Sequence, residues 1–159
     1  MKITLVTVGK IKERFFDQAI KEYEKRLGRY CRLEILQVAD EKTPDGAGEA
    51  LENQIRQREG ERILAKIGDH DYVIALAIEG KMLDSVELAK KIEKLSVDGN
   101  GQVVFIIGGS LGLSDAVLRR ADFLLSFSKM TFPHPLMRVI LLEQIYRANR
   151  IQRGEPYHK

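Results

Sequence analysis

The chain has 159 residues, of which 44% are hydrophobic and 31% charged, with a net charge of +3. This length fits one domain over residues 1–159, and the composition supports a packed core and excludes a disordered chain. No apolar run approaches the roughly 20 residues of a membrane span, no secretory signal is visible, and one cysteine excludes a disulfide framework, so we expect a cytoplasmic protein.

The first half of the chain alternates between strand and helix patterns. Apolar residues recur at steps of three and four in two charged segments, which predicts amphipathic helices. The second of these is expected to bury Leu51, Ile55, Ile63 and Ile67. In order, we expect a strand over 3–8, a helix over about 12–30, a strand over 33–38, a Gly- and Pro-rich loop over 40–48, and a helix over about 49–67.

Three strands of almost unbroken apolar sequence follow, over 72–77, 103–107 and 123–127. Such strands, separated by helices, are typical of a parallel sheet covered on both faces, so we expect an α/β fold. The expected helices run from a cap at Asp84 or Ser85 to about 95, from a cap at Ser114 to about 120, and from Pro135 to about 151.

In open parallel sheets, ligands bind beyond the carboxyl ends of the strands. The three apolar strands are followed by loops over 79–81, 108–112 and 128–134, which therefore compete for the site. The sequence Gly-Gly-Ser-Leu-Gly at 108–112 lacks the spacing of a dinucleotide or Walker loop. It does match the Gly-x-Ser-x-Gly elbow of serine hydrolases, with Ser110 as nucleophile and Asp122 and a histidine as partners. The helix cap at Ser114 lies far from such an elbow, and a backbone loop that admits a flat ligand is the other interpretation.

A metal site is not expected, because His70, His134 and His158 are distant in sequence and none has an i, i+4 partner. His70 is expected in a turn.

The last predicted helix is apolar around a whole turn, at 139–142. A helix that is apolar on all sides is buried on all sides, which indicates either a subunit interface or a core helix.

The basic residues gather at the end of the chain. Residues 129–159 hold six Lys or Arg against two Asp or Glu, whereas residues 1–128 hold 20 against 21. A basic segment of this kind is typical of polyanion binding, with a solvated helix face as the alternative. The RNA-contact candidates are Arg147, Arg150, Arg153 and Lys159.

Three segments carry a family resemblance: Ile-Gly-Gly-Ser-Leu-Gly at 107–112, Leu-Ser-Phe-Ser-Lys-Met-Thr-Phe-Pro-His at 125–134, and Arg-Gly-Glu-Pro-Tyr-His-Lys at 153–159. Over its whole length the sequence resembles the RlmH family of the SPOUT superfamily. The resemblance implies a parallel-sheet α/β methyltransferase fold with a C-terminal trefoil knot, and a cytoplasmic homodimer. It further implies methylation of N3 of a pseudouridine in 23S ribosomal RNA on the assembled ribosome, with S-adenosylmethionine as cofactor and neither metal nor membrane.

Carried over by position, the resemblance implies cofactor contacts from the ends of the three apolar strands. The residues are Leu76, Gly108, Phe127, Ser128, Lys129, Met130, Thr131 and Phe132. Since the N3 imide must lose its proton, a base or an anion stabiliser is expected from His134, Arg138, Tyr157 and His158. We favour His158 and Tyr157 as the groups that face the target base, and Arg138 as a stabiliser of a phosphate or anion. His134 either takes part in the chemistry or fixes the start of the last helix. A serine hydrolase built on Ser110 and a non-catalytic RNA-binding protein are the competing hypotheses.

Overall fold

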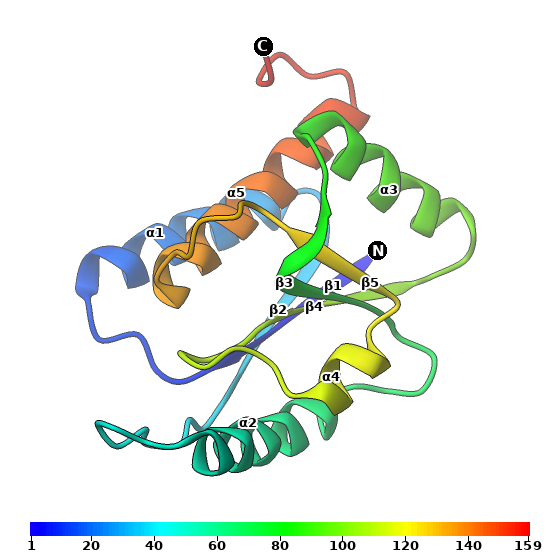
Figure 1. Cartoon of the computed structure of the whole chain (residues 1–159). Helices are drawn as coiled ribbons and strands as arrows, with labels where there is room; N and C mark the ends of the chain where they lie inside the picture. Colours follow the sequence, from blue (N-terminus) through cyan, green and yellow to red (C-terminus); the bar gives the residue numbers. More distant parts are fainter.

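A five-stranded, all-parallel sheet lies between two layers of helices in the computed structural model, which describes residues 1–159 (Figure 1). The expected α/β alternation is confirmed along the chain. The elements are β1 (Lys2–Val8), α1 (Arg14–Leu27), β2 (Arg32–Val38), α2 (Glu49–Leu64), β3 (Tyr72–Met82), α3 (Ser85–Val97), β4 (Gln102–Ile107), α4 (Asp115–Arg120), β5 (Phe123–Ser126) and α5 (His134–Gln152).

The strand order is β2-β1-β4-β3-β5, so β1 and β4 are central. Both are buried along almost their whole length, because helices cover both faces of the sheet. The edge strand β2 instead alternates between exposed and half-buried residues over most of its length.

Each face of the sheet has its own core. Helices α1, α3 and α5 pack on one face, around Ile74, Phe105 and Leu142, and α2 and α4 lie on the other, around Ile63 and Val117 (Figure 1). Burying each such side chain contributes about 1.5–3 kcal/mol relative to leaving it exposed. Val139 of α5 packs against the first of these cores, whereas Ile140, on the outer side of the helix, is only half buried. No helix is both long and apolar enough to cross a membrane.

Two predicted helix starts are confirmed by their caps. Asp84 accepts a hydrogen bond from the Glu87 N–H at 2.7 Å, and the Glu87 carboxylate accepts one from the Asp84 N–H at 2.7 Å. Ser114 Oγ accepts from the Val117 N–H at 3.3 Å and so caps α4. The turn predicted at His70 is also observed.

Several predicted boundaries were wrong. The segment over 79–81 was expected to be a loop but belongs to β3. This strand bulges after Leu76 and pairs with β5 again at Lys81, so that Leu76 and Lys81 both lie opposite Leu125. Helices α1 and α2 are shorter than expected because polar turns end them, and α5 begins one residue earlier, at His134. Leu51 was expected to be buried but is 37% exposed, since it lies in the first turn of α2.

Candidate active site

A cleft of about 890 Å³ opens at the carboxyl edge of the sheet. Its walls come from the end of β3, the loop after β4 and the loop after β5, which are the strand ends singled out in the sequence. Helices α2 and α4 contribute Arg56, Asp115 and Leu118. A cleft of this size lies within the usual range for a bound cofactor.

The β3 wall results from the bulge between Leu76 and Lys81. Leu76, Ala77, Ile78 and Glu79 line the cleft there. The bulged segment crosses β5 closely, because a Cβ on Gly80 would lie 2.6 Å from the Leu124 carbonyl oxygen. Only glycine allows this approach of two backbones.

The loop after β4 makes a tight turn, in which Gly109 and Gly112 pair as an isolated bridge. A Cβ on Gly108 would lie 2.9 Å from Leu113 Cδ2 and 3.0 Å from the Gly112 carbonyl carbon, so a side chain has no room there. Ser110 occupies the exposed tip of this turn, whereas Asp122 binds the Val73 N–H at the opposite, amino edge of the sheet. The predicted Ser110–Asp122 pairing of a hydrolase is therefore wrong.

The loop after β5 is held by two serine contacts. Ser126 Oγ donates to the Ser128 carbonyl at 3.1 Å, and Ser128 Oγ accepts from the Met130 N–H at 3.0 Å. The cofactor candidates that line the cleft are Leu76, Gly108, Phe127, Ser128, Met130, Thr131 and Phe132. Lys129 is exposed and lies outside this lining, and Met130 is 74% exposed at its edge.

His134 lines the cleft at the start of α5. Burial lowers the pKa of its imidazole, and the nearby Arg138 charge lowers that pKa further, so the ring is neutral at pH 7. Its Nδ1 is buried without a hydrogen-bond partner. A neutral imidazole beside a cleft has the chemistry of a proton acceptor.

Arg138 lies below the cleft rather than in its wall. It is 1% exposed, and its Nη2 donates to the carbonyls of Val8 at 2.9 Å and Gly9 at 2.8 Å. Burial lowers the pKa of the guanidinium to about 10, so it stays charged at pH 7. This side chain fixes the end of β1 against α5.

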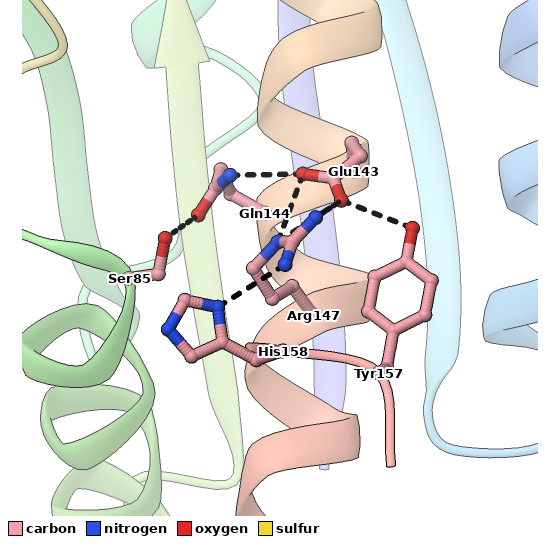
Figure 2. A network of polar contacts seen from close by, with 6 residues as sticks. All are labelled: Ser85, Glu143, Gln144, Arg147, Tyr157 and His158. Carbon is pink, nitrogen blue, oxygen red and sulfur yellow. Dashed lines mark hydrogen bonds and ion pairs between the residues drawn. The ribbon is translucent and has the colours of Figure 1, made fainter.

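Tyr157 and His158 lie along α5 and do not line the cleft of their own chain (Figure 2). The Tyr157 hydroxyl donates to Glu143 Oε1 at 3.1 Å, and His158 Nδ1 lies 3.1 Å from Arg147 Nη1. Arg147 in turn pairs with Glu143 at 2.7 Å. Burial and the Glu143 carboxylate raise the pKa of Tyr157, so its hydroxyl is protonated at neutral pH.

The RNA-contact candidates divide into two pairs. Arg147 and Arg150 are already bound to carboxylates, since Arg150 Nε lies 2.8 Å from Glu155 Oε2. Arg153 and Lys159 are exposed, with the Arg153 guanidinium over the Tyr30 ring at 4.7 Å.

Sequence reasoning missed two charged residues that line the cleft, Arg56 and Asp115, whereas Glu79 belongs to a loop that it had singled out. Nothing in the helical pattern of 49–67 distinguishes Arg56 from the other charged residues of that segment. No group of three or more His, Cys, Asp or Glu side chains is placed to hold a metal ion.

The chain is similar to several known proteins. A family model described as predicted SPOUT methyltransferase matches residues 1–158. Three relatives named ribosomal RNA large subunit methyltransferase H match over 159 residues and 100% of both chains: 65% identity in Bifidobacterium adolescentis, 59% in Clostridium beijerinckii and 56% in Leuconostoc mesenteroides. A solved structure of a probable methylase family protein from Haemophilus influenzae Rd KW20 shares the fold, with a TM-score of 0.57 and 14% identity, covering 99% of this chain and 70% of that one.

Proposed function

The chain belongs to the SPOUT methyltransferase family and, within it, to the ribosomal RNA large subunit methyltransferase H group, and we propose that it methylates N3 of a pseudouridine in the 23S ribosomal RNA of the assembled ribosome. The methyl donor of this family is S-adenosylmethionine. One observation supports the proposal most strongly: the segments at the ends of β3, β4 and β5 line one cleft in a chain of this family. Because its substrate is the ribosome, we assign the enzyme to the cytoplasm.

The cleft suits a flat, largely neutral group such as adenosine. Its walls combine apolar side chains such as Leu76 and Phe132 with exposed backbone, and Gly108 has no space for a side chain. We assign cofactor contacts to the seven lining candidates and place Lys129 at the rim, facing the cofactor carboxylate or the RNA. S-adenosylmethionine supplies a methyl group on a positively charged sulfur, and the protein aligns the attacking nitrogen with it and excludes water.

His134 is our candidate for removing the N3 proton. It lines the cleft and is neutral at pH 7, as a general base must be. Arg138 adds a buried positive charge close to His134, which stabilises the anion left when the imide loses its proton. Arg138 acts through its charge and through the placement of α5, because it does not line the cleft.

The C-terminal residues Tyr157 and His158 complete the site across a homodimer in our proposal. They lie outside the cleft of their own chain, along the outer part of α5 (Figure 2). The half-buried Ile140 on the outer side of the same helix suits a subunit contact. Exposed Arg153 and Lys159 then face the RNA, and Arg147 and Arg150 join them when their carboxylate partners are displaced.

We also propose the C-terminal trefoil knot of the family. The close crossing of Gly80 over Leu124 and the start of α5 beside the cleft support it. Pulling the two ends of a single molecule should give a final length shorter than the roughly 3.3–3.6 Å per residue of an open chain. A full-length extension contradicts the knot.

Methyl incorporation into ribosomes tests the proposed function. Ribosomes from a strain without the enzyme are incubated with the protein and S-adenosylmethionine labelled in its methyl group. We expect label in the large-subunit RNA of assembled ribosomes and far less in free RNA, because the basic segment alone binds RNA weakly and in a salt-sensitive way. Failure of folded protein to label these ribosomes contradicts the proposal.

A further inference from the structure

Helix α2 lies against the loop that follows β4, at three places along one helix face. Arg56, Glu59 and Gly60 make these contacts with the segment from Gly109 to Ser114. None of the three was a candidate site residue. Their spacing of three and four residues puts them on the same side of the helix.

Arg56 makes the polar contact. Its Nη1 donates to the Leu111 carbonyl at 3.3 Å, at the tip of the turn, while its Nη2 is held by Asn53 Oδ1 at 2.6 Å. Glu52 Oε2 lies 3.8 Å from Nη1. The guanidinium is thus fixed from two sides on α2 before it reaches the loop, and it also lines the cleft.

Glu59 lies beneath the same turn. Its side chain is buried, its Oε2 accepts the Glu41 N–H at 2.9 Å, and a Cβ on Gly109 would be 3.0 Å from its Oε1. One carboxylate therefore fills the space beside Gly109 and holds the start of the loop after β2. Burying a carboxylate costs stability unless it is hydrogen-bonded, which argues for a specific role at this place.

We propose that Arg56 and Glu59 are positioning residues, which hold the loop over 108–112 in the shape that binds S-adenosylmethionine. The turn contains three glycines and a serine, so its own sequence does little to restrict its backbone. Contacts from α2 supply this restriction. The inference rests on the assignment of the cleft to the cofactor in the proposed function.

Cofactor affinity of Arg56 variants tests the proposal. We expect Arg56→Ala to raise the Kd for S-adenosylmethionine, measured by calorimetry, on the order of tenfold. The KM for S-adenosylmethionine should rise by the same factor, because the variant loses one charged hydrogen bond. The kcat at saturating cofactor and the KM for ribosomes should change little. Arg56→Lys should recover much of the affinity, because an ammonium can also donate to the Leu111 carbonyl.

The matched control is Arg58→Ala, two residues along α2, where the side chain is 54% exposed and lies 3.8 Å from Glu41 Oε1 instead of binding the turn. It should bind the cofactor like the unchanged protein. Glu59→Ala should also weaken cofactor binding. If the Glu59→Ala protein does not fold, the Arg56 variants alone test the proposal. Wild-type affinity in folded Arg56→Ala, or equal losses in Arg56→Ala and Arg58→Ala, would overturn the inference. A wild-type protein that binds no S-adenosylmethionine would instead overturn the proposed function.

Discussion

His134 and His158 lie in the same basic segment but have different surroundings. His134 is half buried beside the cleft, next to the charge of Arg138, whereas His158 is exposed and contacts Arg147. Desolvation favours the neutral form of His134, and Asp40 and Glu13 oppose this only in part. The two rings therefore suit different tasks: a proton acceptor in the cleft and an exposed contact on the tail.

The lowered pKa of His134 predicts a pH-dependent loss of stability. The imidazole of His134 has a lower pKa in the folded chain than its ordinary value of about 6.5 in the unfolded chain, so the unfolded chain takes up the imidazole proton first as pH falls. The contribution of neutral His134 to the free energy of unfolding is therefore complete above about pH 7 and decreases at lower pH. We expect the free energy of unfolding to decrease more between about pH 7 and about pH 5 in wild type than in His134→Asn. Urea unfolding at one protein concentration measures the free energy of unfolding at each pH. The same pH dependence in wild type and His134→Asn would contradict this prediction.

Removal of Tyr157–Lys159 separates chemistry from cofactor binding. These residues lie outside the cleft, so the truncated protein should bind S-adenosylmethionine with unchanged Kd. Single-turnover methylation of ribosomes should be at least tenfold slower, within the usual range for loss of an acid–base or positioning group. An unchanged rate rules out a role for the tail in catalysis.

At the scale of elements, α2 and α4 pack closely because one residue of α2 has no side chain. A Cβ on Gly60 would lie 2.3 Å from Ser114 Oγ and 3.1 Å from Ser114 Cβ. Ser114 is buried and caps α4, so it cannot move away without loss of that hydrogen bond. The position of α4, which forms part of the cleft wall, thus depends on Gly60.

Gly60→Ala should therefore destabilise the protein. The cost of crowding, about 1–3 kcal/mol, exceeds the gain in helix propensity of about 1 kcal/mol. Chemical denaturation should show a net loss on the order of 1 kcal/mol, partly recovered in Gly60→Ala/Ser114→Ala. Gly101→Ala is the control, because a Cβ there meets nothing within 4 Å. Equal stability of Gly60→Ala and wild type contradicts this packing argument.

The sheet could be predicted because the residues of each strand indicate that strand by themselves. Unbroken apolar runs such as 103–107 and caps such as Asp84 and Ser114 need no knowledge of the rest of the fold. The bulge after Leu76 could not be predicted, since it depends on pairing with Leu125. Arg56 was missed for the same reason: its partner, the Leu111 carbonyl, is 55 residues away in sequence.

At the scale of the whole molecule, the basic surplus of residues 129–159 lies on α5, its preceding loop and the tail. Two of these arginines are paired with Glu143 and Glu155 in the single chain. Arg138 is buried as well, so the exposed positive charge is smaller than the sequence count suggests. A dimer would bring two such segments together, which supports a shared RNA surface.

Ile140→Asp should dissociate the proposed dimer. Ile140 lies on the half-buried outer side of α5, and a carboxylate placed in an apolar contact loses hydration without gaining a partner. Sedimentation of the variant should show monomers. The rate of ribosome methylation should also fall, because the proposed tails act across subunits. Val97→Asp is the control, since Val97 is 80% exposed at the end of α3. A dimeric Ile140→Asp protein contradicts the proposed interface.

The most direct test of the central claim is nucleoside mass spectrometry of 23S RNA from treated ribosomes. Ribosomes lacking the modification are incubated with S-adenosylmethionine and either wild type or Gly108→Val, whose added side chain would collide with Leu113 and the Gly112 backbone. We predict 3-methylpseudouridine with wild type and none with the variant. A methyl group on any other nucleoside, or equal product from a folded Gly108→Val protein, would contradict this account.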